Sequence, residues 1–126
     1  MTRASREKGK RGERQLASLL RAALPELADG IRRGWQSRVG CDDPDVCGLP
    51  GFWVEHKCGR LPNPRAAYAQ ATRDADGRAM PLAVIQDDRA RERLCVLGLT
   101  DFLTILRAAY GWTPPLCVPV RAEVAV

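Results

Sequence analysis

The sequence predicts an α/β fold in which helices flank a central mixed β-sheet. Apolar residues recur at helical spacing near the N-terminus, and a continuous apolar run at residues 82–85 suits a strand buried on both faces. Residues 44–57 have the pattern of a β-hairpin. The expected order is helix, three strands, helix, two strands, helix, and 126 residues suffice for one such domain.

The first helix is expected over residues 11–24, because leucines and alanines repeat there at helical spacing and Pro25 follows. The charged residues 1–9 are expected to form a flexible basic arm ahead of it. Glu13 lies at the edge of the apolar stripe. A carboxylate there is either the partner of an arginine or a functional residue, and the pattern alone favours the arginine partner.

A strand is expected over residues 33–39, and the register of the hairpin at residues 44–57 decides which side chains share a face. A two-residue Pro-Gly turn would place Asp45 opposite His56, whereas a three-residue Leu-Pro-Gly loop would place it opposite Glu55. The second register is expected, because two acids on opposite faces of a buried hairpin would each lose hydration without compensation.

The second half of the chain predicts a helix over residues 63–76, with Asn63 as N-cap, and strands at residues 82–85 and 94–99. A final helix is expected to begin at Thr100 as its N-cap. The domain as a whole is expected to cover residues 10–112. The remaining tail, residues 113–126, is expected to form an edge strand or a dimer contact.

The charge balance favours a polyanionic partner, although a charge of +5 could also serve only to keep a small protein soluble. Basic residues crowd the first fourteen positions and precede the hairpin. No apolar run approaches the roughly 18 residues of a membrane span, and the N-terminus lacks the apolar core of a signal peptide. A cytoplasmic location without membrane contact is therefore expected.

The cysteines are odd in number and lack a CxxC motif, which favours reduced thiols over a disulfide framework. A zinc site is the alternative, because several candidate ligands lie close in sequence. Its spacing matches no established zinc pattern. Its members would be Cys41, Cys47, His56 and Cys58.

Glu55 and Lys57 would project from the same face of a strand, since side chains alternate along extended backbone. If Asp45 joins them, two carboxylates and a lysine form a site of the kind that holds a divalent cation beside a phosphodiester. The alternative is a surface salt bridge between Glu55 and Lys57, worth about 0 to 1 kcal/mol. His56 would face away from this site and pack beneath the sheet.

The residues in this order resemble the PD-(D/E)xK nuclease superfamily. A helix carrying Glu13 precedes Pro44-Asp45, then Glu55-His56-Lys57, and then a helix carrying Gln70. The basic opening at residues 8–14 resembles archaeal-type Holliday junction resolvases and related small phage nucleases. The resemblance covers roughly residues 8–97 and implies a restriction-endonuclease-like core.

The resemblance also implies roles for single residues. Asp45 and Glu55 would bind Mg²⁺, or Mn²⁺ in its place, with the backbone carbonyl of His56 as a further ligand. Glu13 would reach the metal directly or through water, which reverses the preference drawn from pattern alone. The remaining catalytic candidates are Lys57, which would position water and steady the transition-state charge, and Gln70, which would orient Lys57 or contact the scissile phosphate.

The expected partner is DNA, branched DNA included, bound by a homodimer that supplies two active sites. The tail residues Trp112, Leu116, Val118 and Val120 are the expected dimer contact. A general flap or nicking nuclease and a non-catalytic basic DNA-binding module are the alternatives. The expected DNA contacts are Lys8, Lys10, Arg11, Arg14, Arg32, Arg33, Ser37 and Arg38.

Overall fold

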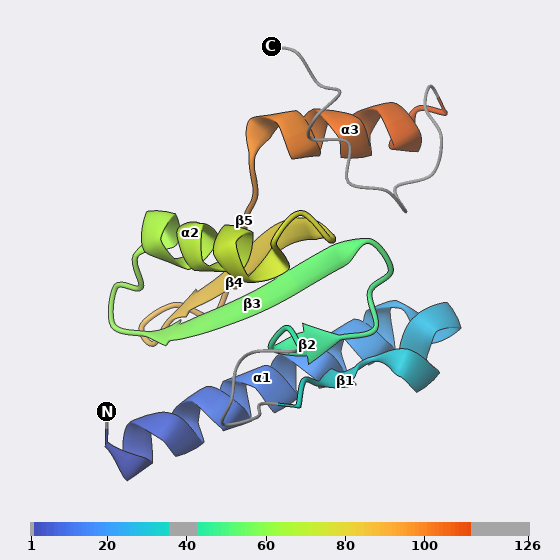
Figure 1. Ribbon diagram of the computed structural model, residues 1–126. Coiled ribbons are helices and arrows are strands. Elements are labelled where there is room, and N and C mark those ends of the chain that lie inside the picture. Colours follow the sequence, from blue (N-terminus) through green and yellow to red (C-terminus); the bar gives the residue numbers. More distant parts are fainter. Residues whose placement is uncertain (1, 36–42, 112–126) are drawn as a thin grey trace.

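The computed structural model describes residues 2–35 and 43–111. It is an α/β structure in which one mixed sheet of five strands lies between helices (Figure 1). The chain runs α1, a 3₁₀ turn, β1, β2, β3, α2, β4, β5 and α3. The predicted α/β class with a mixed sheet, and the predicted order of helices and strands, are therefore confirmed.

The sheet has its strands in sequence order, from β1 to β5. Antiparallel pairing joins β1 to β2, β2 to β3 and β4 to β5, whereas β3 and β4 run parallel. The parallel pair needs a crossover, and α2 provides it. The strands are β1 (Arg32–Arg33), β2 (Val46–Cys47), β3 (Phe52–Gly59), β4 (Met80–Asp87) and β5 (Leu94–Val96).

Helix α1 (Arg3–Ala23) covers one face of the sheet, and α2 (Pro64–Ala75) covers the other (Figure 1). Leu16 and Ala17 of α1 pack with Val54 and Val84, whereas Ala67 of α2 packs with a separate group on the opposite face. Small alanines along α2 allow its backbone to lie close to the strands. Helix α3 (Leu99–Ala109) follows β5 and lies beyond α2.

The prediction that the first helix begins near residue 11 was wrong. The helix begins at Arg3, and Thr2 caps it by accepting a hydrogen bond from the Ser5 amide at 3.1 Å. The segment expected as a basic arm is thus helical from its third residue. Lysine and arginine are good helix formers, and the cost of Gly9, about 1 kcal/mol, does not stop the helix.

The other predicted boundaries agree with the structure only in part. Asn63 caps α2 as expected, accepting from the Ala66 amide at 3.1 Å. Thr100 does not cap α3, because the helix begins at Leu99 with Gly98 as its cap. The strand expected over residues 33–39 is only Arg32–Arg33 within the described part of the chain. Its remaining positions 36–39 and the tail after residue 111 lie outside the described residues.

Candidate active site

The β2–β3 hairpin has the register that brings Asp45 and Glu55 together. Val46 lies opposite Val54, so the next facing pair is Asp45 and Glu55. The Phe52 amide donates to the Leu49 carbonyl at 3.1 Å, and Gly51 at φ 84° supplies the left-handed conformation of the turn. The prediction of the three-residue loop, rather than the two-residue turn, is confirmed.

Glu55 is a buried carboxylate, with only 3% of its surface exposed. Its Oε1 accepts a hydrogen bond from Nε1 of Trp53 at 3.0 Å. Burial, followed by the nearby charge of Asp45, raises the pKa of Glu55 to about 8. Without metal, Glu55 is therefore largely protonated at neutral pH. A cation bound in place of that proton would also offset the repulsion between Glu55 and Asp45.

Asp45 lies close enough to two other acids, Glu13 and Glu55, for its charge to affect both. Its Oδ2 accepts from the backbone amide of His56 at 2.8 Å, which fixes the carboxylate across the hairpin. Its charge raises the pKa of Glu55 on β3 and also the pKa of Glu13 on α1. Carboxylates from a helix and from both sides of a hairpin thus act on one another electrostatically.

Glu13 on α1 has the arginine partner that the sequence pattern favoured, and it is also close enough to Asp45 to be affected by its charge. Its Oε2 accepts from Nε of Arg33 at 2.7 Å, and 14% of its side chain is exposed. Burial and then the charge of Asp45 raise the pKa of Glu13, while the Arg33 guanidinium opposes the shift. Glu13 is therefore both the partner of an arginine and a neighbour of Asp45.

Lys57 is half-buried on the same face of β3 as Glu55, two positions along the strand. The ion pairs formed by the described residues do not join Lys57 to Glu55. The salt-bridge alternative is therefore wrong.

Helix α2 brings two polar residues to the Glu55 side of the sheet. Gln70 is half-buried, and Asp74 follows one turn later on the same side of the helix. The charge of Asp74 contributes to the raised pKa of Glu55. Sequence reasoning missed Asp74, although its spacing of four from Gln70 could have indicated it.

His56 lies on the opposite face of β3, as predicted. It is 5% exposed and packs against α1 where that helix has Gly12. A Cβ at Gly12 would come within 2.6 Å of Cε1 of His56, so the close helix approach depends on glycine. Burial lowers the pKa of His56 and favours the neutral ring. The imidazole is therefore separated from the carboxylate site by the strand itself.

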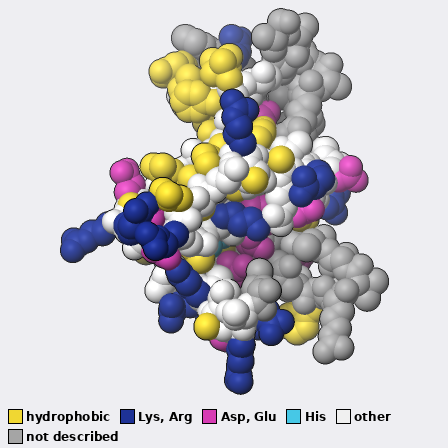
Figure 2. Space-filling model, turned by 90° about the vertical axis from the view of Figure 1, so that its left-hand side faces the viewer, with side chains coloured by type: hydrophobic (Ala, Val, Ile, Leu, Met, Phe, Trp, Pro, Cys, Tyr) yellow, Lys and Arg dark blue, Asp and Glu magenta, His cyan; other side chains and the backbone are white. Residues whose placement is uncertain are grey.

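Several of the basic residues expected to contact DNA pair with acids in this structure. Lys8 pairs with Asp88, Arg33 with Glu13, and Arg32 with Asp43 at 3.7 Å. The longest of these contacts joins Lys10 to Glu7 at 3.9 Å. Figure 2 shows acidic side chains gathered in the middle of one face with basic side chains around them. Arg11 and Arg14 lie on α1, and Ser37 and Arg38 lie outside the described residues.

The donor set suits a hard divalent cation, but it is not preassembled. Within residues 2–35 and 43–111, no three His, Cys, Asp or Glu side chains lie together in a ready metal-binding arrangement. Of the zinc alternative, Cys47 and Cys58 are free thiols and Cys41 lies outside the described residues. Asp45 and Glu55 nevertheless provide facing carboxylate oxygens whose repulsion a bound cation would offset.

Comparison with known proteins found no matching family model, no matching curated protein and no matching solved structure. Among the helices that the structure describes, none is both long enough and apolar enough to cross a membrane.

Proposed function

We propose that this chain is a metal-dependent DNA endonuclease with a restriction-endonuclease-like core. The observation that supports this best is the hairpin register, which sets Asp45 opposite Glu55 with Lys57 on the same strand face. Glu13 adds a third carboxylate from α1. This is the set of groups that the PD-(D/E)xK pattern requires, in the order in which the resemblance expects them.

Asp45 and Glu55 would hold Mg²⁺ or Mn²⁺, with the His56 carbonyl and Glu13 as further ligands, the latter directly or through water. A bound cation supplies Lewis-acid stabilisation of negative charge on the phosphate. Binding of the cation would displace the proton from Glu55. Its positive charge would then offset the repulsion from Asp45 that contributes to the raised pKa of Glu55.

Lys57 would donate a hydrogen bond to the attacking water or to a phosphate oxygen, which orients the nucleophile and steadies the developing charge. Gln70, on α2 beside the same strand face, would hold the Lys57 ammonium or contact the scissile phosphate. The surrounding arginines and lysines would attract the DNA backbone. In this arrangement the ion pairs of Lys8, Arg32 and Arg33 would open as phosphates replace the carboxylates.

The finer proposal is a structure-selective nuclease that acts on branched DNA in the cytoplasm, as a homodimer with one active site per subunit. Cleavage of a labelled four-way junction, a flap and a linear duplex at equal concentrations tests this substrate preference. Paired symmetric cuts in the junction would support a resolvase. Equal cleavage of all three substrates would contradict the resolvase proposal and favour a general flap or nicking nuclease.

A non-catalytic DNA-binding module is the second candidate, and the Glu13–Arg33 ion pair favours it, because an acid held by arginine can serve structure alone. Asp45→Asn separates the two. If the chain is a nuclease, the wild type should cut DNA in the presence of metal and the variant should bind DNA without cutting it, whereas a binding module should cut DNA in neither form.

A further inference from the structure

Trp53 contacts the proposed metal-binding face through its indole N–H. The side chain is 6% exposed and lies two residues before Glu55, on the same side of β3. Nε1 of Trp53 donates to Oε1 of Glu55 at 3.0 Å. A buried indole N–H normally has a hydrogen-bond partner, and here the partner is a carboxylate of the candidate site.

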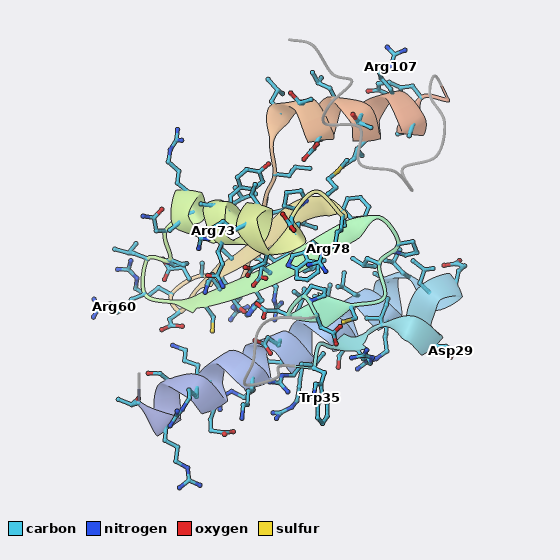
Figure 3. All side chains as sticks on the ribbon, in the orientation of Figure 1. Asp29, Trp35, Arg60, Arg73, Arg78 and Arg107 are labelled. Atoms are coloured by element: carbon cyan, nitrogen blue, oxygen red, sulfur yellow. The ribbon has the colours of Figure 1, made fainter. Side chains whose placement is uncertain are left out.

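The Arg78 guanidinium lies over the face of that indole ring. It is 4.7 Å from the centroid of the Trp53 ring, within the range of a cation–π contact. The same guanidinium donates to the carbonyls of Asp74 at 2.7 Å and Ala75 at 3.1 Å, at the end of α2. Figure 3 shows Arg78 where α2 ends above β3. Arg78 and Trp53 therefore connect the end of α2 to Glu55.

We propose that Trp53 is a positioning residue that orients the Glu55 carboxylate for metal binding, and that Arg78 holds the indole in place. The hydrogen bond occupies Oε1 and restricts rotation of the carboxylate, which would leave Oε2 for a cation held together with Asp45, the residue that faces Glu55 across the hairpin. The inference rests on the proposed function, because it concerns the same site. It assigns roles to a tryptophan and an arginine that lie outside the PD-(D/E)xK pattern.

Metal binding without DNA gives the first test. Mn²⁺ titration by calorimetry would compare the wild-type protein with Trp53→Phe, which removes the N–H and keeps an aromatic ring under Arg78. Loss of an outer hydrogen bond to a metal ligand typically weakens binding by about 10- to 100-fold, and that loss is expected here. Trp35→Phe is the matched control, because Trp35 is 76% exposed and should bind Mn²⁺ as the wild type does.

Titration of the Glu55 carboxyl by NMR, without metal, gives the second test. The indole hydrogen bond opposes the rise in the Glu55 pKa, so Trp53→Phe should move the titration to higher pH. Arg78→Ala retains the indole, is expected to preserve the core, and should shift the titration in the same direction by a smaller amount. An unchanged Glu55 titration in both variants would overturn the inference.

The two tests separate failure of this inference from failure of the proposed function. A wild-type protein that binds no Mn²⁺ would overturn the proposed function and, with it, the metal-binding role of Trp53. Wild-type Mn²⁺ binding that Trp53→Phe leaves within about twofold would overturn only the positioning role. Weaker binding together with a raised Glu55 titration supports both.

Discussion

Asp45 and Glu55 face each other across the β2–β3 hairpin, and the charge of Asp45 adds to burial in raising the pKa of Glu55 to about 8. Two acids held in this way destabilise the protein unless a proton or a cation lies between them. Binding of a proton or a metal ion by this pair should therefore change the stability of the folded protein.

The stability of the metal-free protein should fall as the pH rises from about 4.5 to about 8. Glu55 has an ordinary pKa of 4.5 and a raised pKa in the folded state, so the folded protein binds more protons within this window. Its contribution is fully present below pH 4.5 and is lost by about pH 8, on the order of a few kcal/mol.

Urea unfolding in EDTA across this pH range measures the effect. Glu55→Gln should flatten the dependence and make the metal-free protein more stable than the wild type at pH 8. Glu26→Gln, at an exposed acid in the turn after α1, should leave the slope unchanged. A wild-type slope retained in Glu55→Gln would contradict the assignment of the raised pKa to this residue.

Divalent metal should stabilise the folded protein, with a larger effect at pH 8 than at pH 6, because the cation competes with the proton on Glu55. At 100 times the dissociation constant, the gain in unfolding free energy is about 2.7 kcal/mol. Thermal melts with increasing Mg²⁺ or Mn²⁺ would show it. Asp45→Asn should remove the gain, and equal stabilisation of this variant would place the metal elsewhere.

Lys57→Ala should reduce DNA cleavage by about 10²- to 10³-fold, the usual cost of losing a group that stabilises transition-state charge. DNA binding measured by fluorescence anisotropy should change little, since one lysine contributes one charge among many. Arg60→Ala, at an exposed position just after β3, is the matched control and should retain cleavage. Full activity of Lys57→Ala would exclude a catalytic role.

Gly12→Ala should destabilise the protein by about 1 to 3 kcal/mol, because a methyl group there would come within 2.6 Å of Cε1 of His56 in the buried α1–β3 contact. Gly9→Ala should instead stabilise it by up to about 1 kcal/mol, since Gly9 lies in the same helix with no atom near its Cβ position. Urea unfolding of both variants tests the contact. Equal effects would contradict it.

The hairpin register was predictable because local chemistry and patterning agreed. Pro50-Gly51 indicates a turn with Gly51 in the left-handed region, and the cost of burying two acids on opposite faces selects the register that places Asp45 opposite Glu55. The start of α1 was less predictable, because the charged residues at positions 1–9 fit both a mobile arm and a helix capped at Thr2.

The surroundings of Glu55 were not predictable from spacing alone. The hydrogen bond from Trp53 to the Glu55 carboxylate depends on the orientation of the buried indole ring. Asp74 and Arg78 reach the same region because α2 crosses over β3 on the return to β4. These contacts depend on packing between elements, which no short sequence pattern specifies.

Metal-dependent cleavage of a labelled four-way junction by purified wild-type and Glu55→Ala proteins tests the proposed function most directly. The wild type should cut the junction in Mg²⁺ and stop in EDTA, whereas Glu55→Ala should bind the junction without cutting it in either condition. Cleavage by Glu55→Ala at the wild-type rate, or by the wild type in EDTA, would contradict the assignment of a metal-dependent nuclease site to this hairpin.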